Sequence, residues 1–408
     1  MQPHSPINAH NLSNQDVTKE ETLSLPFFLE RNMGDCPQQC CHRFIFSPYI
    51  SFFFFFFLVL FPSTQVNGKS TSLKHWSGSS HASSTGECDL FTGTWVLDPS
   101  YPLYKNATCP FIQKEFSCER NGRPDRIYTH YRWQPLACNL QRFNGQDFLE
   151  RMKGKSIMFV GDSLSLNQWQ SLTCLLHAAV PNSNYTINRV GYVSIFTFTE
   201  YNVKLMLDRS VYLVDVVKED RGRVLKLDSI EGGKLWKGID MLIFNTWHWW
   251  YRRGPTQPWD YIEVGGQVMK DMDRMKAFQK ALETWAAWVD TNVDPTKVKV
   301  FFQGISPSHY NGTQWNEPTA NSCVHETTPV AGSTYPGGTP EAVAVLKGVL
   351  ATMTKPVTLL DITTLSLLRK DGHPSLYGLY TPNGMDCSHW CLAGVPDTWN
   401  EILYNLMI

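Results

Sequence analysis

The chain has 408 residues and nearly equal numbers of basic and acidic side chains, so its formal charge is −1 at pH 7. A chain of this length can form one large domain or two smaller ones. The balanced charge argues against a nucleic-acid partner, because binding nucleic acid needs a clear basic excess. Its 14 Trp and 16 Tyr fit either a large aromatic core or surfaces on which sugar rings stack.

Three segments precede the part of the chain that is expected to fold. Residues 1–43 are polar and lack periodicity, which predicts a disordered cytosolic tail. Residues 44–61 form an uncharged apolar run, which as a helix would reach about 27 Å, the lower limit for crossing a bilayer. Arg31 and Arg43 precede this run and favour a type II signal anchor with a lumenal remainder; a cleaved signal peptide is the alternative. The Ser- and Gly-rich residues 62–85 are interpreted as a flexible stem.

The cysteines beyond the apolar run form an even set of eight, because three of the 11 in the chain precede it. A zinc site is the alternative to disulfides, but there is no C-x₂-C pair and the spacings are irregular. Disulfides in a secretory compartment fit better, although the residues alone leave their pairing open. Sequons at Asn106, Asn184 and Asn311 agree with N-glycosylation in that compartment. The eight cysteines are Cys88, Cys109, Cys118, Cys138, Cys174, Cys323, Cys387 and Cys391.

Residues 86–408 are expected to form a lumenal domain with two parts. Residues 86–150 contain turns and aromatics but little periodicity, which predicts a small lobe stapled by disulfides. Residues 151–408 alternate apolar runs with amphipathic segments, which predicts an α/β fold: a mostly parallel sheet with helices on both faces. The expected strands are 155–160, 192–201, 202–207, 210–217, 238–246, 297–305 and 357–363. The expected helices are 165–178, 269–290, 339–353 and 396–408.

Ser163 is the candidate nucleophile. It follows the expected strand 155–160 and precedes a helix, so it would stand at the carboxyl edge of the sheet, where the sites of such folds lie. Backbone N–H groups of the helix start would lie beside it. The alternative is a Gly161-Asp162 turn in which Ser163 only caps the helix. Asp162 is interpreted as a turn or helix-start residue rather than a catalytic carboxylate.

Asp386 and His389 are the candidate acid–base pair for Ser163. They are three residues apart in a turn-rich segment, so the carboxylate can orient its own histidine and leave the other ring nitrogen free for the serine. Cys387 and Cys391 bracket the histidine, and disulfides there would hold the loop rigid. For a single D-x-x-H pattern, a surface loop pair is the alternative.

The tetrahedral oxyanion of acyl transfer needs hydrogen-bond donors. The candidates are the backbone N–H of Ser163, the side chain of Asn245 at a strand end, and the backbone N–H of Gly191. Both Asn245 and Gly191 have turn roles as alternatives, because both residue types are common in turns.

Two further histidines could belong to the site. His248, within NTWHWW, competes as a base but lacks an adjacent carboxylate, so a structural role among tryptophans ranks higher. His373 stands two residues after Asp371 in RKDGHPS, a similar D-x-H pair, and is interpreted as a loop anchor.

Five blocks together carry a family resemblance: RNGRPDRIYTHYRWQPLAC, the GDS of residues 161–163, NTWHWW, RKDGHPS and DCSHWCLAGVPDTWNEIL. From CDLFTGTWVLDPSYPLY to its C-terminus the chain resembles the plant trichome-birefringence-like family of polysaccharide O-acetyltransferases, relatives of the SGNH/GDSL esterases. The resemblance implies a Golgi-anchored enzyme with Ser163 as nucleophile and an Asp-x-x-His block at Asp386 and His389. The 43 residues before the apolar run depart from the family. The implied disulfides are Cys88–Cys138, Cys109–Cys174, Cys118–Cys391 and Cys323–Cys387.

The expected function is transfer of an acetyl group, through an acyl-serine, to a hydroxyl of a cell-wall polysaccharide such as xylan, mannan, xyloglucan or pectin. No metal or bound cofactor is expected, and the acetyl donor is a co-substrate of unknown identity. An acetylesterase with the same triad is the first alternative, because water can replace the sugar hydroxyl. A non-catalytic polysaccharide-bridging protein is the second, and core packing is expected for most of the tryptophans that motivate it. Those tryptophans are Trp133, Trp236, Trp247, Trp249 and Trp250.

Overall fold

The structure is a computed structural model that describes residues 88–378 and 384–408. The expected tail, anchor and stem, residues 1–43, 44–61 and 62–85, lie outside these ranges. Among the helices of the described ranges, none combines the length and the apolar character needed to cross a membrane.

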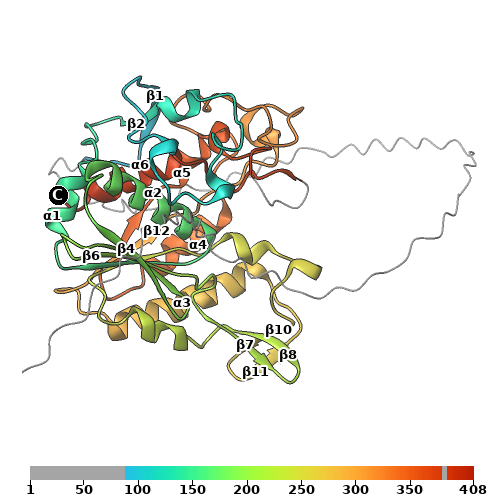
Figure 1. Ribbon diagram of the computed structural model, residues 1–408. Coiled ribbons are helices and arrows are strands. Elements are labelled where there is room, and N and C mark those ends of the chain that lie inside the picture. Colours follow the sequence, from blue (N-terminus) through green and yellow to red (C-terminus); the bar gives the residue numbers. More distant parts are fainter. Residues whose placement is uncertain (1–87, 379–383) are drawn as a thin grey trace, which may run out of the picture. The chain divides into compact units, whose positions relative to one another are not determined.

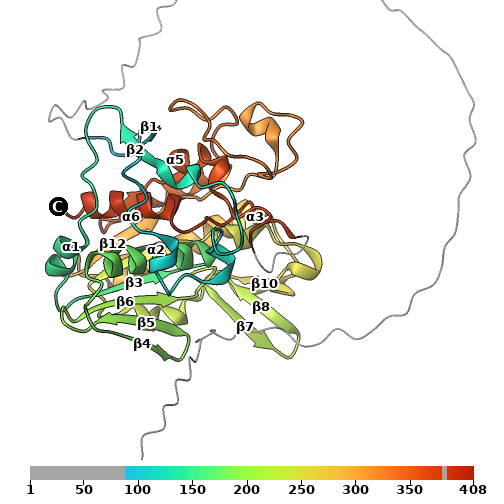
Figure 2. The same ribbon diagram turned by 45° about the horizontal axis from the view of Figure 1, so that its top comes forward.

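A seven-stranded sheet forms the centre of the domain (Figure 1), in the order β13-β12-β9-β3-β6-β5-β4. The strands from β13 to β6 run parallel, and the β4–β5 hairpin adds an antiparallel edge. Figure 2 shows β3, β6, β5 and β4 side by side in that order. The predicted mostly parallel sheet is confirmed. The strands are β3 (Ser156–Val160), β4 (Tyr185–Val190), β5 (Val193–Phe198), β6 (Val203–Asp208), β9 (Met241–Phe244), β12 (Lys299–Gln303) and β13 (Thr358–Leu360).

Helices cover both faces of the sheet because the central strands are apolar on both sides. On β3, Ile157 and Phe159 belong to the core shared with α2 and α6, whereas Met158 and Val160 face the core shared with α3 and α4. In Figure 1, α2 and α6 lie above the sheet and α3 lies below it. The predicted helices on both faces are confirmed. The helices are α1 (Gly145–Arg151), α2 (Ser163–Ala179), α3 (Arg274–Asn292), α4 (Glu341–Leu350), α5 (Thr363–Leu367) and α6 (Val395–Asn405).

A second sheet lies between β6 and α3 in the chain and was not predicted. Its order is β11-β10-β8-β7. The prediction of a strand over residues 210–217 is wrong in its first half, because the strand begins only at Asp215. Tyr212, Leu213 and Val214 lie in a loop, and their apolar side chains are buried there. The four strands are β7 (Asp215–Glu219), β8 (Gly222–Lys226), β10 (Tyr261–Val264) and β11 (Gln267–Met269).

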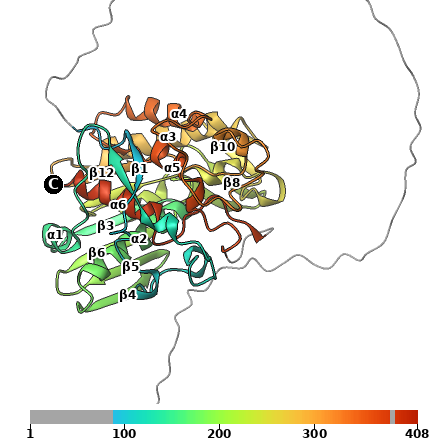
Figure 3. The same ribbon diagram turned by 90° about the horizontal axis from the view of Figure 1, so that it is seen from above.

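The N-terminal lobe packs onto the helical layer of the α/β part. It contains an antiparallel pair, β1 (Gly93–Leu97) and β2 (Tyr131–Pro135), and several single-turn helices. The indole of Trp95 donates to the carbonyl of Leu365 in α5 at 2.8 Å, and the Tyr104 hydroxyl donates to Asp397 in α6 at 3.0 Å. Figure 3 shows α1 beside the C-terminal end of α6, where the Tyr404 hydroxyl donates to Asp147 at 2.7 Å. The lobe and the α/β part therefore share one hydrophobic core.

The described residues contain the four disulfides that the family resemblance implies. One lies within the lobe, two join the lobe to α2 and to the loop after His389, and one joins two loops near Asp386. They are Cys88–Cys138, Cys109–Cys174, Cys118–Cys391 and Cys323–Cys387.

The three sequons differ in accessibility. Asn184 and Asn311 are exposed, so glycosylation there stays a prediction. The Asn106 side chain is buried, and its amide donates to the carbonyl of Leu392 at 2.7 Å. Glycosylation at Asn106 also stays a prediction, and in the folded domain a glycan there would displace this packed amide.

Candidate functional site

The site residues lie at the carboxyl ends of neighbouring strands. β6, the next parallel strand along the chain, pairs with one side of β3. β9 pairs with the other side of β3. The loops after β3 and β9 therefore diverge, and the carboxyl edge between them is where doubly wound sheets bind ligands. Ser163 follows β3, and Asn245 follows β9.

A tight turn presents Ser163 as the first residue of α2. Asp162 caps this helix, because its Oδ1 accepts a hydrogen bond from the N–H of Leu164 at 2.9 Å. Gly161 is required by close packing: a Cβ there would lie 2.2 Å from the carbonyl oxygen of Asn245. The predicted helix-start role of Asp162 is confirmed. Among the described residues the N–H of Ser163 has no hydrogen-bond partner, so it can donate to an oxyanion.

Asn245 lies beside the nucleophile turn but is engaged by Asp162. Its Nδ2 donates to Asp162 Oδ1 at 2.5 Å, and the N–H of Trp247 donates to Asp162 Oδ2 at 3.3 Å. The Asp162 carboxylate thus ties the loop after β9 to the start of α2. One amide hydrogen of Asn245 remains for substrate, and its oxyanion role stays a prediction.

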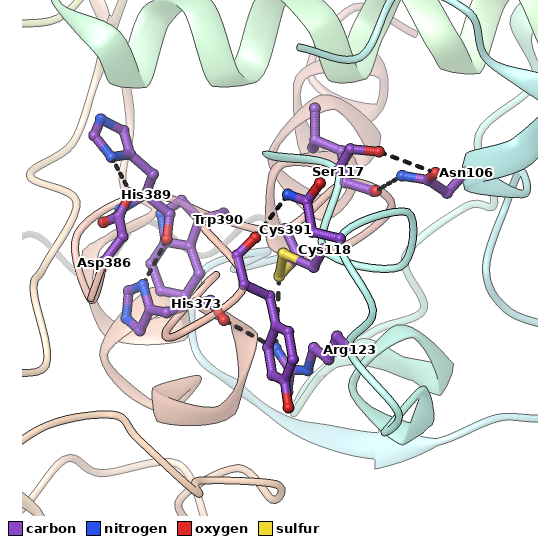
Figure 4. Close-up of a disulfide and its surroundings, with 12 residues drawn as sticks. Asn106, Ser117, Cys118, Arg123, His373, Asp386, His389, Trp390 and Cys391 are labelled. Atoms are coloured by element: carbon purple, nitrogen blue, oxygen red, sulfur yellow. Dashed lines mark hydrogen bonds and ion pairs between the residues drawn. A yellow bond between two sulfur atoms is a disulfide. The ribbon is translucent and has the colours of Figure 1, made fainter. Parts of the chain in front are cut away.

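Ser163, His389 and Asp386 form a continuous hydrogen-bonded chain. His389 Nε2 lies 2.6 Å from Ser163 Oγ, and His389 Nδ1 lies 2.7 Å from Asp386 Oδ2. Because an ionised carboxylate only accepts, Nδ1 carries the proton and Nε2 is free to accept the serine hydroxyl. Figure 4 shows the carboxylate of Asp386 directed at the ring of His389. This is the arrangement needed for a base-activated serine.

The loop around Asp386 keeps the carboxylate ionised and fixed. Its Oδ1 accepts from the N–H and the hydroxyl of Ser388, both at 2.9 Å, and from the N–H of His389 at 3.1 Å. Burial alone would raise the pKa of Asp386, but the charge and hydrogen bond of His389 outweigh it, so that the pKa is lowered. For His389, burial lowers the pKa, but the charge and hydrogen bond of Asp386 prevail and raise it above its ordinary value.

Asn167, one turn after Ser163 on α2, aligns the two halves of the site. Its Oδ1 accepts from the N–H of Trp390 at 2.8 Å, and its Nδ2 donates to the carbonyl of Trp390 at 3.1 Å. Trp390 directly follows His389, so a side chain of the nucleophile helix holds the main chain of the base loop. The link between Asn167 and Trp390 joins residues that are 223 positions apart, so it becomes evident only in the folded structure.

Replacing Asn167 by Leu is expected to lower both stability and turnover. The free energy of unfolding should fall by about 2–4 kcal/mol, because two buried main-chain groups lose their partner. The rate constant kcat for acetyl-ester cleavage should fall by up to about 10²-fold, because the His389 ring is no longer held in line with Ser163 Oγ. Chemical denaturation and steady-state kinetics measure the two effects.

Gln168→Leu is the matched control for Asn167→Leu. Gln168 is equally buried on α2, but its amide donates to Asn400 of α6 at 3.2 Å and has no hydrogen bond to the base loop. This variant should lose stability while keeping kcat. Equal losses of kcat in both variants would show that Asn167 has no specific alignment role.

The structure places Gly191 outside the site. It lies in the turn of the β4–β5 hairpin, and β4 is three strand spacings from β3. Since the turn joins β5 and β4, which are two and three spacings from β3, its lateral offset at about 4.8 Å per spacing is about 10–14 Å, too far to donate to an oxyanion at Ser163. The oxyanion prediction for Gly191 is therefore contradicted. Its place in the turn between β4 and β5 accounts for its positive φ of 59°.

His248 and His373 have structural partners. His248 Nε2 donates to the carbonyl of Ser306 at 2.8 Å, and burial lowers its pKa. His373 has no bond to Asp371, which instead pairs with Arg369 at 2.8 Å. The His373 ring reaches the main-chain carbonyl of His389 (Figure 4), so His373 anchors the base loop, as predicted, but through another partner.

Sequence reasoning missed Arg209 and Glu115 beside the site. Arg209 follows the last residue of β6, whose carbonyl accepts from the N–H of Gly161 at 3.0 Å, so it lies level with the nucleophile turn. Its side chain is exposed and has no hydrogen bond or ion pair among the described residues. Burial raises the pKa of Glu115, while the charge of nearby His389 opposes this. The strand-end rule that singled out Asn245 would also have found Arg209.

Comparisons with known proteins agree with this geometry. Residues 140–406 match the GDSL/SGNH-like Acyl-Esterase family found in Pmr5 and Cas1p, and residues 86–139 match the PMR5 N terminal Domain. Protein trichome birefringence-like 41 of Arabidopsis thaliana is 65% identical over 79% of this chain and 90% of its own length. The chain belongs to the trichome birefringence-like family. Protein trichome birefringence-like 39 of the same plant is 55% identical over 79% of the chain and 88% of its own length.

The family membership extends to a more distant relative. Protein trichome birefringence of Arabidopsis thaliana is 39% identical and covers 84% of this chain, which spans 59% of that relative. The α/β fold of this trichome birefringence-like protein agrees with its match to the GDSL/SGNH-like family. The boundary between the two family matches falls between residues 139 and 140, before α1, whereas the predicted division of lobe and α/β part falls after residue 150.

Proposed function

We propose that this protein transfers acetyl groups to hydroxyls of a plant cell-wall polysaccharide through an acyl-enzyme on Ser163. The observation that carries the proposal is the hydrogen-bonded chain from Ser163 Oγ to His389 to Asp386, at 2.6 and 2.7 Å. Membership in a family of acyl-esterase type supports acyl chemistry. The polysaccharide acceptor, the acetyl donor and a lumenal Golgi location with residues 44–61 as anchor belong to the same proposal.

In the first half-reaction Ser163 Oγ attacks the acetyl carbonyl of the donor, and its proton passes to His389 Nε2. The bond from the acetyl carbon to the donor breaks, and the donor leaves with the proton that His389 holds. Asp386 remains ionised and stabilises the imidazolium. The free N–H of Ser163 donates to the tetrahedral oxyanion, with Asn245 as the second proposed donor.

In the second half-reaction a sugar hydroxyl attacks the acetyl-serine. His389 Nε2 takes the hydroxyl proton, the ester bond to Ser163 breaks, and the serine oxygen recovers a proton from His389. The acetyl group ends on the sugar and the enzyme returns to its first state. If water takes the place of the sugar, the same steps release acetate, and the protein acts as an esterase.

The deciding experiment incubates the purified protein with an acetylated donor and unacetylated xylan, mannan, xyloglucan or pectin. Glycan mass and free acetate are followed together. A gain of acetyl groups on glycan supports transfer. Release of acetate from acetylated polymer, with no gain on any acceptor, overturns the transferase proposal in favour of the esterase.

A purely polysaccharide-bridging role has little support in the aromatic side chains that motivated it. Four of the five tryptophans are buried in the core, and only Trp249 is partly accessible, with Arg252 stacked on its ring at 3.6 Å. Core packing thus explains most of them, as expected. The buried set is Trp133, Trp236, Trp247 and Trp250.

Arg209→Gln is expected to lower kcat/KM by about 10- to 100-fold, because a charge-assisted hydrogen bond to a substrate oxygen contributes about 1.5–3 kcal/mol. Arg209 is an exposed residue level with Gly161 and has no hydrogen bond in the described ranges, although its charge acts on Asp162 and Glu115, so its loss should change the melting temperature only slightly. Arg253→Gln is the control, since Arg253 is also exposed but pairs with Asp271 at 3.7 Å. An unchanged kcat/KM in Arg209→Gln would contradict a substrate-binding role.

A further inference from the structure

Behind the base loop, two buried histidines are joined ring to ring. His309 Nδ1 lies 2.6 Å from His373 Nε2, and both side chains are at most 1% exposed. At the outer ends, His309 Nε2 lies 2.8 Å from the carbonyl of Leu367, and His373 Nδ1 lies 2.6 Å from the carbonyl of His389. The two rings therefore bridge α5 to the main chain of the catalytic histidine.

A count of protons shows what this bridge requires. Both outer contacts end on carbonyl oxygens, which only accept, so His309 Nε2 and His373 Nδ1 must each carry a proton. The inner contact between the two rings needs one more proton, on either nitrogen. Two neutral imidazoles supply two protons, one short of the three that the contacts need. A neutral pair would leave two lone pairs facing each other at hydrogen-bonding distance, which is strongly unfavourable in a buried site.

We propose that His309 and His373 share one proton beyond those of two neutral rings, and that this singly charged pair positions His389 for catalysis. His373 is then a positioning residue, because it acts on the main chain of His389 and does not touch the reacting atoms. The pair takes its third proton from solvent by ordinary protonation.

The surroundings both oppose and favour this charge. Burial lowers the pKa of His309 to about 4 and that of His373 well below its ordinary value. The carboxylates of Asp371 and Asp386 act in the opposite direction, and the His373 ring stacks on Trp390 at 4.1 Å, where a cation meets the face of the indole. We expect the carbonyl contacts to prevail, because only the charged pair satisfies them all. The other charged or titratable neighbours are Arg123, Tyr335, Arg369, Lys370 and His389.

The main-chain links around the pair explain how its charge reaches the site. The N–H of His309 donates to the carbonyl of Cys387 at 2.9 Å, between Asp386 and His389. Arg123 donates to the carbonyl of His373 at 2.9 Å, which fixes the far side of the anchor (Figure 4). If the third proton is lost, one contact of the bridge must open, and the His389 carbonyl is then free to move.

The charge of the pair can be measured directly in the wild-type protein. In protein labelled with ¹⁵N-histidine, nitrogen shifts at a pH of about 6.5, the ordinary pKa of histidine, should show three protonated nitrogens for the two rings. His309→Gln and His373→Asn assign the signals. One unprotonated nitrogen on each ring at this pH would overturn the proposal, whether or not the protein transfers acetyl groups.

The positioning role is tested by kinetics, and this part rests on the proposed serine chemistry. His373→Phe keeps a ring on Trp390 but loses the donor to the His389 carbonyl, and kcat for an acetyl ester should fall by about 10²-fold. His373→Asn returns an N–H donor near the position of Nδ1 and should recover most of kcat. Equal losses in both variants would contradict positioning through this carbonyl.

The pH profile distinguishes the shared proton from a merely structural contact. As pH rises, the wild-type pair should lose its third proton and kcat should fall. In His309→Gln the inner contact no longer demands that proton, because neutral His373 can donate from Nδ1 alone, so this alkaline fall should disappear. If kcat falls in the same way at high pH in the wild type and in His309→Gln, the pair does not share a third proton.

Discussion

Replacing Ser163 by Ala is expected to lower kcat for acetyl transfer or acetyl-ester cleavage by about 10⁴- to 10⁶-fold, because the proposed acetyl-serine can no longer form. Among the residues that the structure describes, the side chain of Ser163 is hydrogen-bonded to His389 alone. The free energy of unfolding should therefore change by no more than about 1 kcal/mol. Peptide mass analysis after incubation with donor should detect acetyl-Ser163 in the wild type and not in the variant.

Ser165→Ala is the matched control. Ser165 lies two residues further along α2, is fully buried, and has no hydrogen-bond partner for its hydroxyl among the described residues. The same chemical change there should leave kcat within a few-fold of wild type. Wild-type turnover in Ser163→Ala, or acetylation of the enzyme at another residue, would rule out the nucleophile assignment.

Asp386→Asn is expected to lower kcat by about 10⁴-fold, because the histidine loses the acceptor that fixes its tautomer and stabilises its charged form. The pH dependence should change as well. His389 acts as a base only when neutral, so kcat/KM rises with pH as its proton is lost. Asp386 raises the pKa of His389, so the wild-type midpoint should lie above the ordinary value of about 6.5.

Without the Asp386 carboxylate, burial is the largest remaining influence and lowers the pKa of His389, while the smaller effects of Asp162 and Glu115 oppose it. The midpoint of kcat/KM in Asp386→Asn should therefore move to lower pH, together with the loss of rate. Ser388→Ala removes one hydrogen bond of 2.9 Å to the carboxylate and keeps its charge. That control should change kcat by less than about tenfold. If the midpoint of kcat/KM in Asp386→Asn does not move, a group other than His389 determines the fall of kcat/KM at low pH.

Much of the α/β framework could be predicted because its periodicity is local. The strand 155–160 and the helix 165–178 are apolar runs bounded by a glycine turn, and both exist with shifted ends. The second sheet was missed because its strands are short and half-exposed, as in Asp215–Glu219. Tyr212 and Leu213 misled the prediction, since buried loop residues are as apolar as strand residues.

The site was predictable where one chain segment carries the chemistry, and unpredictable where side chains meet across segments. Asp386 and His389 are neighbours in the chain, so their contact followed from spacing. The link from Asn167 to Trp390 spans 223 residues, and the contact of His309 with His373 spans 64. Such contacts depend on side-chain direction in the folded state. Gly191 failed for the same reason, since the strand order that removes it from Ser163 is a property of the whole sheet.

The separation of Ser163 from its base has a consequence for the biogenesis of the enzyme. Ser163, the proposed nucleophile, precedes His389 by 226 residues, and the loop that carries His389 is held by a disulfide whose cysteines are 273 residues apart. A growing chain therefore exposes its serine long before any partner can activate it. A nascent or reduced chain should be inert toward acetyl donors, so the first turnover of each molecule marks the completion of its folding and oxidation.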